Sequence, residues 1–288
     1  MSLACLPDLS SAHDVSVEQV NQFQQNGHIL LKGVVSPSEM MAYRPHIVDA
    51  VMNYDREEEI LEQIAAGRKN GWRFVHNLWE RDEVVRQFVL ARRFAKIAAD
   101  LMAVSAVRLL RDESYFKEPG GASTPWHQDC DFFPLDTPQV ISMWIALSDI
   151  SVEMAPLTFA SGSHKDGYFV PEDNNILQGF SEQSLIKRGF QLDNHGAMAA
   201  GDATFHAGWT LHSSGVNTSD RIREALVIVY YQDGAHVWMQ QGSKLNEENY
   251  LQGCPKDIIR QQHLTRCLPG LKHGDLAASY KNPLVYTV

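Results

Sequence analysis

The chain has 288 residues, of which 44% are hydrophobic and 21% are charged, a composition typical of a folded globular protein. Lys and Arg number 25 against 35 Asp and Glu, so the net charge is −10, which disfavours nucleic acid or an anionic membrane as a partner. No run approaches the ~18 apolar residues of a membrane-spanning helix, and the N-terminus lacks the features of a signal peptide. The four cysteines form no CxxC pair or zinc spacing, so we expect free thiols and a cytoplasmic protein.

The first hundred residues carry helix signals. Residues 16–19 (SVEQ) form a capping box, and the helix that they open can end at Gly27. Residues 28–31 then read as a short strand. A second capping box at 36–39 (SPSE), with proline at the first helical position, predicts a helix that runs toward Tyr54.

Two further segments complete this predicted helical region. Residues 57–71 are charged and polar, which indicates a helix end and a loop. From Asp82 to Met102, apolar residues recur at intervals of three and four, and this spacing predicts one long helix.

After residue 104 the periodicity becomes that of strands. Strands are predicted at 106–117, 139–148, 156–160, 203–206 and 222–232. The last of these is apolar on both faces, as expected for a strand between two layers. Residues 165–195 hold few strand signals and are predicted to form a long insertion, and the polar tail from Asp233 holds one helix near 255–265.

Helices followed by regularly spaced strands predict a mainly β fold with flanking α-helices, either a sandwich or a barrel. No repeat, low-complexity tract or linker divides the chain. We therefore expect one domain over residues 1–288, with helices at about 15–103, a barrel core at about 104–232 and a tail at 233–288.

The segment Trp126-His127-Gln128-Asp129 places an imidazole and a carboxylate two residues apart. In a strand such residues point the same way, so His127 and Asp129 would lie side by side. They would supply two members of the two-histidine, one-carboxylate set that holds non-haem Fe(II) and leaves three positions open. Because the motif by itself is common, the prediction depends on a third ligand.

Either of two downstream histidines could be that ligand. His212 precedes a Ser-Ser-Gly turn, which places it at a strand end, where metal ligands lie at the mouth of a barrel. His206 falls inside an apolar run, where a buried core histidine is the commoner explanation. This reasoning favours His212.

Arg223 follows His212 by 11 residues, and a turn over 213–220 would bring the two side by side. A guanidinium at that place could clamp a dicarboxylate through a forked, charge-assisted pair of hydrogen bonds. A surface arginine at a strand start is the alternative, and Arg221 competes for the same role.

These residues, in this order, resemble the phytanoyl-CoA dioxygenase (PhyH-like) family. The resemblance spans about residues 15–232 and rests on HQD at 127–129, MWIAL at 143–147, SGSHK at 161–165, LHSSGVN at 211–217, Arg223 and the opening at 18–33. Family members are Fe(II)- and 2-oxoglutarate-dependent oxygenases with a double-stranded β-helix, also called a jelly roll or cupin-like barrel. That fold agrees with the strand pattern.

The resemblance implies an Fe(II) site formed by His127, Asp129 and His212, with 2-oxoglutarate and O2 as co-substrates. It implies that Arg223 pairs with the far carboxylate of 2-oxoglutarate, with Ser214 as a hydroxyl donor beside it, and that Trp144 and Thr158 line the same pocket. One departure from the family pattern and one agreement with it bear on these roles. Residues 153–157 (EMAPL) stand where relatives often carry an Asn-Gly turn, and the presence of Asp129 disfavours halogenation, which needs that ligand position vacant.

The prime-substrate pocket is expected around the iron motif. Its predicted residues are Trp126, Cys130, Phe132, Phe133, Tyr115, Lys117 and Arg111. Aromatic side chains there suit an apolar or ring-bearing molecule, and the cations could hold an acidic group or be paired at the surface. One of the two phenylalanines is expected to belong to the core, and Trp209, Trp238 and the tail could cover the mouth.

The predicted function is therefore an Fe(II)- and 2-oxoglutarate-dependent dioxygenase that hydroxylates a small organic molecule in secondary or lipid metabolism. One alternative is an inactive barrel that binds a small molecule, which the intact set of His127, Asp129, His212 and Arg223 disfavours. The other is a cupin-type metalloenzyme that uses no 2-oxoglutarate. Arg223 disfavours it, because a carboxylate clamp has no purpose without a dicarboxylate.

Overall fold

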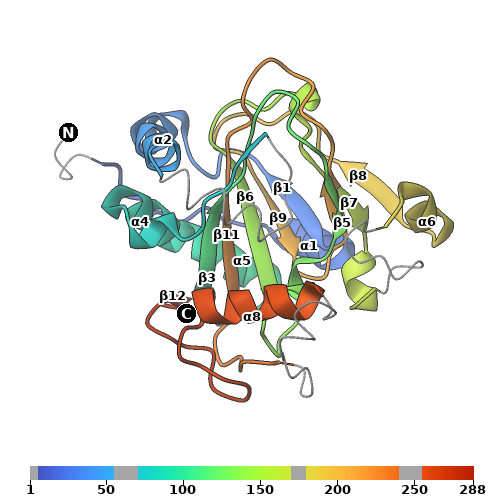
Figure 1. Ribbon diagram of the computed structural model, residues 1–288. Helices are drawn as coiled ribbons and strands as arrows, with labels where there is room; N and C mark the ends of the chain where they lie inside the picture. The colour runs from blue at the N-terminus through green and yellow to red at the C-terminus, as the bar shows by residue number, and fades with distance from the viewer. Residues whose placement is uncertain (1–5, 55–70, 170–179, 240–254) are drawn as a thin grey trace.

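The computed structural model describes residues 6–54, 71–169, 180–239 and 255–288. Two β-sheets face each other, and the N-terminal helices cover the outer side of the larger sheet (Figure 1). The helices are α1 (Val17–Asn26), α2 (Pro37–Met52), α4 (Glu83–Val89), α5 (Arg92–Met102), α6 (Glu182–Lys187) and α8 (Pro255–Cys267). Short 3-10 helices are η2 (Leu78–Glu80), η3 (Asp129–Asp131), η4 (Val152–Met154) and η5 (Ser163–Asp166).

The larger sheet has six strands in the order β1-β9-β6-β11-β3-β12. Their bounds are β1 (His28–Leu31), β9 (Ala203–Ala207), β6 (Val140–Ala146), β11 (Ala225–Gln232), β3 (Ala106–Ser114) and β12 (Leu284–Thr287). The smaller sheet has the order β5-β10-β7-β8, with β5 (Thr124–His127), β10 (His212–Ser214), β7 (Leu157–Ser161) and β8 (Gln191–Asn194). A third sheet pairs β2 (Trp72–Arg73) with β4 (Phe116–Lys117). This is the jelly-roll arrangement that the sequence predicted, although the two main sheets do not close into a continuous barrel.

Both predicted capping boxes are present. The Ser16 side chain accepts a hydrogen bond from the backbone N–H of Gln19, and Ser36 does the same for Glu39. Gly27 ends α1 in the left-handed conformation, with φ of 78°.

The single helix predicted from Asp82 to Met102 is wrong, because the chain forms α4 and α5 with a break at Leu90 and Ala91. Ala91 is extended, with ψ of 121°. The break re-aims the chain so that Phe88 and Phe94 pack together with ring centroids 5.1 Å apart.

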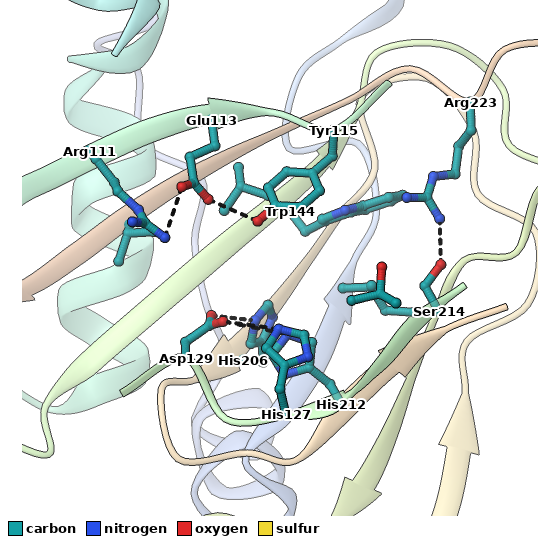
Figure 2. Close-up of a pocket in the computed structure, with 14 residues that line it drawn as sticks. Arg111, Glu113, Tyr115, His127, Asp129, Trp144, His206, His212, Ser214 and Arg223 are labelled. Atoms are coloured by element: carbon teal, nitrogen blue, oxygen red, sulfur yellow. Dashed lines mark hydrogen bonds and ion pairs between the residues drawn. The ribbon is translucent and has the colours of Figure 1, made fainter. Parts of the chain in front are cut away.

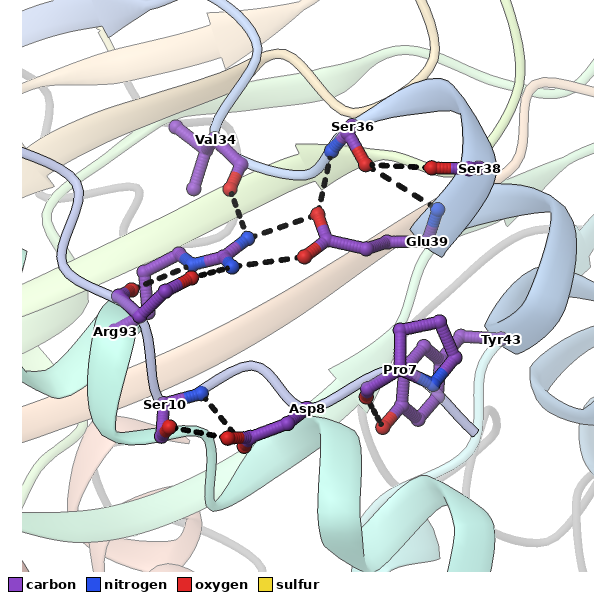
Figure 3. A network of polar contacts seen from close by, with 10 residues as sticks. Pro7, Asp8, Ser10, Val34, Ser36, Ser38, Glu39, Tyr43 and Arg93 are labelled. Atoms are coloured by element: carbon purple, nitrogen blue, oxygen red, sulfur yellow. Dashed lines mark hydrogen bonds and ion pairs between the residues drawn. The ribbon is translucent and has the colours of Figure 1, made fainter. Parts of the chain in front are cut away.

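A buried ion pair connects helices α2 and α5. Arg93 of α5 donates from Nη2 and Nη1 to the two carboxylate oxygens of Glu39 on α2, at 2.8 and 2.9 Å, and from Nη1 to the carbonyl of Val34 at 3.1 Å (Figure 3). Glu39 also accepts from the backbone N–H of Ser36, so the second capping box and this ion pair share one carboxylate.

The prediction that 222–232 is apolar on both faces is confirmed within β11. Leu226, Ile228 and Tyr230 face the helices, whereas Val227, Val229 and Tyr231 face the space between the sheets. This central strand therefore separates the helix-side core from the core that surrounds the site.

Two predicted segments differ in detail, and a third is almost entirely untested. The strand predicted at 106–117 ends at Ser114, and its last residues form β4 in a separate sheet. The insertion at 165–195 contributes α6 and also β8, which extends the smaller sheet beside β7. The segment 57–71 lies almost entirely outside the described residues.

The tail contains the predicted helix, α8, and also β12, which was not predicted and which pairs with β3 at the sheet edge. Cys130 and Cys267 are free buried thiols, whereas Cys5 and Cys254 lie outside the described residues. Among the helices described, none is both long and apolar enough to cross a membrane.

Candidate active site

Three potential metal ligands converge at one end of the smaller sheet. His127 ends β5 and His212 begins β10, and the two residues are direct cross-strand partners, with ring centroids 4.2 Å apart. Asp129 does not continue the strand as predicted but starts η3, which turns its carboxylate back toward both imidazoles. One ligand atom from each of the three residues lies within 4.8 Å of the others.

The backbone fixes the orientation of both imidazoles. His127 Nδ1 lies 2.8 Å from the carbonyl oxygen of Pro125, and His212 Nδ1 lies 2.9 Å from that of Thr210. Since a carbonyl can only accept, Nδ1 carries a proton in each ring, which leaves Nε2 as the atom that can bind a metal. These Nε2 atoms lie 3.5 and 3.7 Å from Oδ1 of Asp129.

The electrostatics of the cluster favour a bound cation. Burial, together with the neighbouring His127 and His206, holds the pKa of His212 well below its usual value. Burial alone would raise the pKa of Asp129, but the surrounding imidazoles, His212 foremost, outweigh burial and keep that pKa well below its ordinary value. Two imidazoles and one carboxylate on one face fit non-haem Fe(II), the group that the sequence predicts for this site.

His206 and Ser142 extend this cluster into the larger sheet. His206 is buried, as the sequence indicated for a core histidine, but its Nε2 lies 3.2 Å from Oδ2 of Asp129. Ser142 donates to the same oxygen at 2.7 Å.

Arg223 lies at the opposite end of the same pocket (Figure 2). It precedes β11 and is 1% exposed, and its guanidinium stacks on the rings of Trp144 and Trp72. Nη1 donates to Ser214 Oγ at 2.8 Å and to the carbonyl of Ala155, whereas Nε has no partner among the described residues. Burial lowers the pKa of Arg223 to about 9, and no carboxylate of the described chain forms an ion pair with it.

The carbonyl that receives Arg223 comes from the segment that departs from the family pattern. Ala155 occupies the left-handed conformation, with φ of 55°, which an Asn-Gly turn would adopt at lower cost. The unusual residues at 153–157 therefore still make a tight turn, and this turn directs the Ala155 carbonyl into the site.

Ser214 joins two buried cations. Its Oγ accepts from Arg223 Nη1 and from Lys117 Nζ, the latter at 2.7 Å, and it donates to the carbonyl of Ala155 at 2.9 Å. Its single hydrogen is thus already used within the protein, so the residue positions Arg223 and Lys117 rather than pointing a free donor into the pocket.

The wall between the two ends comes from β3 and the residue after it. Arg111, Glu113 and Tyr115 alternate along the chain, so all three face the pocket. Glu113 Oε1 pairs with Arg111 Nη2 at 2.8 Å and with His76 at 2.9 Å, and Tyr115 donates to Oε2 at 3.0 Å.

The C-terminal helix reaches this wall. His263 of α8 lies 2.8 Å from Arg111 Nη1 through Nε2, and its Nδ1 lies 2.9 Å from the carbonyl of Phe132. Since the guanidinium can only donate, His263 is neutral and carries its proton on Nδ1. Burial and the charge of Arg111 hold the pKa of His263 well below its usual value.

The pocket brings together eight of the fourteen residues predicted for the site, and also His206, the ligand candidate that was not favoured. It is lined by Arg111, Glu113, Tyr115, Thr124, His127, Asp129, Trp144, Leu157, His206, His212, Ser214, Arg223, Val227 and Val229. Glu113 was missed, although it lies between Arg111 and Tyr115 in the same alternation. Val227 and Val229 could have been found by the same rule on β11, whereas nothing in the local sequence pointed to Ser142 or His263.

Six residues predicted for the site do not line the pocket: Trp126, Cys130, Phe132, Phe133, Lys117 and Thr158. Trp126 alternates with His127 and packs in a separate apolar cluster with Phe169 and Leu185. Thr158 pairs with Ser213, on the face opposite to His212 and Ser214, and accepts a hydrogen bond from Asn194.

The other four residues lie close to the pocket but pack in the protein interior behind it. Cys130 and Phe133 are buried in the inner-face core, and the Phe133 ring supports the guanidinium of Arg111 at 4.8 Å. Phe132 packs against this core, with its ring centroid 6.4 Å from that of His127. Lys117 is fully buried behind Ser214.

Known proteins share both the fold and the sequence pattern. The family model for phytanoyl-CoA dioxygenase (PhyH) matches residues 23–225. Phytanoyl-CoA dioxygenase domain-containing protein 1 of Danio rerio is 25% identical over 289 residues, covering 83% of this chain and 96% of its own length. A 2-aminoethylphosphonate dioxygenase from uncultured bacterium HF130_AEPn_1 is 25% identical over 221 residues, covering 74% and 80%. The epimerase SnoN, solved with Fe3+, alpha ketoglutarate and nogalamycin RO, superposes with a TM-score of 0.65 at 20% identity, over 92% of this chain and 96% of SnoN.

The jelly roll and the His-Asp-His cluster within it define a non-haem iron, 2-oxoglutarate-dependent dioxygenase. Iron is the metal and 2-oxoglutarate the co-substrate of this class. The chain belongs to the phytanoyl-CoA dioxygenase (PhyH) family, whose model covers 203 of its 288 residues.

Proposed function

We propose that this dioxygenase hydroxylates a small organic molecule that carries an acidic group. The observation that carries the oxygenase part is Arg223, a buried guanidinium with no ion-pair partner in the described chain, which shares one pocket with the His-Asp-His cluster. A buried charge without a partner is costly, so a dicarboxylate that reaches from the metal to Arg223 would satisfy it.

His127, Asp129 and His212 would hold the iron, because Nε2 of both histidines faces Oδ1 of Asp129. The backbone hydrogen bonds at Nδ1 keep each Nε2 directed there. Bound there, iron would supply the oxidising chemistry, with three open positions for the 2-oxo acid end of 2-oxoglutarate and for O2. The protein fixes the tautomers through Pro125 and Thr210, so neither imidazole must reorient when the metal enters.

Arg223 would bind the far carboxylate of 2-oxoglutarate. Its remaining N–H groups, including Nε–H, are available for a forked pair. Trp144 stacks on the guanidinium and limits its movement, and Ser214 fixes Nη1. Ser214 would therefore act on the co-substrate through Arg223 rather than as the hydroxyl donor that the family resemblance implies.

The prime substrate would lie against the wall formed by Arg111 and Tyr115. Arg111 is 6% exposed and lines the pocket, and its Nε–H has no partner among the described residues. Glu113 and His263 hold the guanidinium in place, so it can receive a carboxylate or phosphonate without reorganising. The similarity to a 2-aminoethylphosphonate dioxygenase supports a small acidic substrate.

The first experiment is an anaerobic titration of the purified protein with Fe(II) and then 2-oxoglutarate, followed by its visible spectrum. We expect a weak charge-transfer band that needs both additions and that is lost in His212→Ala. Iron binding without the band would favour a cupin-type enzyme that uses no 2-oxoglutarate. Absence of iron binding would favour a binding module.

The substrate class is tested by succinate release with matched pairs of small acids and their amides or alcohols. We expect turnover with members of the acidic series, and a loss of the preference for acids in Arg111→Met. Arg108→Met is the matched control, because Arg108 is on the same strand but pairs with Asp233 away from the pocket. Equal effects of the two substitutions would contradict the assignment of Arg111.

A further inference from the structure

The two oxygens of Asp129 have different surroundings. Oδ1 faces Nε2 of His127 at 3.5 Å and of His212 at 3.7 Å. Oδ2 is held by two other groups, Ser142 Oγ at 2.7 Å and His206 Nε2 at 3.2 Å. The carboxylate thus offers one oxygen to the ligand cluster, while the larger sheet holds the other.

The sheet register explains why both donors reach one atom. Ser142 on β6 and His206 on β9 are direct cross-strand partners, so their side chains lie side by side on the same face. Both residues are buried, so water does not compete for Oδ2. Because an ionised carboxylate can only accept, His206 donates from Nε2, and its Nδ1 is left without a partner in the described chain.

We propose that Ser142 and His206 are positioning residues that keep Asp129 a one-oxygen ligand. Carboxylates bind metals through either one oxygen or two. If Oδ2 were released, it could swing onto the metal and occupy a position that 2-oxoglutarate or O2 requires. The pair on β6 and β9 prevents this movement. The inference rests on the proposed metal site and adds two residues that do not themselves bind the metal.

The same contacts argue against His206 as a ligand. Its Nε2 is bonded to Oδ2, whereas Nε2 of His127 and of His212 face Oδ1. In addition, the described histidines and carboxylates that approach one another closely enough to hold a metal ion are His127, Asp129 and His212.

The test measures binding rather than turnover. Calorimetry under anaerobic conditions measures the Kd for Co(II) in Ser142→Ala and His206→Phe. A second titration measures the Kd for 2-oxoglutarate in the same variants at saturating Fe(II). Loss of such a supporting hydrogen bond is expected to weaken metal binding by about 10- to 100-fold. We expect 2-oxoglutarate to bind more weakly as well, because a two-oxygen Asp129 competes for its position. Ser142→Thr and His206→Gln, which keep a donor, should recover most of both affinities.

Two controls remove comparable groups without touching Asp129. His28 is the cross-strand partner of His206 on β1 and is equally buried, but its ring hydrogen-bonds to Ser161 and His195, so His28→Phe should leave both Kd values unchanged. Thr204→Val removes a buried hydroxyl that has no hydrogen-bond partner in the described chain and should also be silent.

Wild-type affinities in Ser142→Ala and His206→Phe, or equal losses in His206→Phe and His28→Phe, would overturn the inference. So would retention of metal in His212→Ala with its complete loss in His206→Phe, since His206 would then be the ligand. If the wild-type protein itself binds no iron, the proposed function fails. If only the variants behave like wild type, the positioning role alone fails.

Discussion

At the residue scale, Asp129 and Arg223 lie at opposite ends of a single pocket. Asp129 is surrounded by imidazoles that can accept a metal, and Arg223 is surrounded by aromatic rings and carbonyl oxygens. A buried arginine usually has an acidic partner in the same chain. In the described part of this chain Arg223 has none, and this is why we assign its charge to the co-substrate.

We predict that Arg223→Leu weakens 2-oxoglutarate binding by about 100-fold, which corresponds to about 3 kcal/mol for the loss of a buried charge pair. Arg223→Lys should recover part of this loss, because a lysine restores the charge but not the forked geometry. Anaerobic titration of the Fe(II) protein measures both. Arg221→Leu serves as the control, since that neighbouring arginine is exposed, and a larger effect there would reverse the assignment.

Much of this residue set was readable from the sequence. The pair His127 and Asp129, the choice of His212 and the candidate Arg223 all came from spacing and family resemblance. Spacing did not reveal that His206 also contacts Asp129, because that contact depends on the pairing of β9 with β6 and not on any local pattern.

At the scale of elements, short turns and helix ends position the site. Ala155 is the clearest case, because it is a non-glycine residue in the left-handed region, and its carbonyl accepts from both Arg223 and Ser214. The site therefore depends on a backbone conformation that costs the chain free energy.

We predict that Ala155→Gly raises the free energy of unfolding by about 0.5–1 kcal/mol, since glycine removes the left-handed penalty but adds unfolded-state entropy. Urea unfolding of both proteins measures the change. Ala103→Gly should shift stability in the same direction, because Ala103 ends α5 with φ of 56°. A loss of stability in both variants would show that neither turn is strained.

The link between α2 and α5 has a defined pH dependence. Hydrogen bonding to Arg93, followed by that to Ser36, lowers the pKa of Glu39 to about 2 from its ordinary value of 4.5. A carboxyl with a depressed pKa stabilises the fold above the unfolded-state pKa, and this stabilisation is lost as the pH falls through the folded-state value.

We predict that Glu39→Gln lowers the free energy of unfolding by about 1–3 kcal/mol at pH 7, as for other hydrogen bonds to charged groups. The difference from wild type should shrink as the pH is lowered from about 4.5 toward 2. Chemical unfolding at several pH values measures it. Glu83→Gln is the control, because its pair with Arg86 is exposed, and we expect a change of less than about 1 kcal/mol. A pH-independent difference for Glu39→Gln would contradict the ion-pair explanation.

At the scale of the whole molecule, the tail belongs to the core around the pocket. The end of α8 packs against the inner-face residues of the larger sheet through three buried side chains, Leu264, Cys267 and Leu268. His263 of the same helix contacts the pocket wall. The sequence suggested that the tail could cover the mouth of the pocket, but deletion of this segment would also remove part of the core. Point substitutions are therefore the appropriate test.

We predict that Leu268→Ala destabilises the protein by about 2–5 kcal/mol, because the side chain is fully buried and leaves a cavity. Leu276→Ala, in the same tail, should change stability by less than about 0.5 kcal/mol, because that side chain is 49% exposed. Denaturant unfolding compares the two. Similar, small effects would mean that α8 only rests on the molecule.

The sequence by itself determined the elements whose signals are local. The capping boxes at 16–19 and 36–39, the apolar strand β11, the helix in the tail and the HxD motif all follow from the chemistry of neighbouring residues. The tertiary structure decided which side chains meet in the pocket. Ser142 contacts Asp129, His263 contacts Arg111, and Thr158 and Trp126 point away from the pocket. These contacts depend on strand register and on the packing of one element on another, which join residues far apart in the chain and which no local pattern specifies.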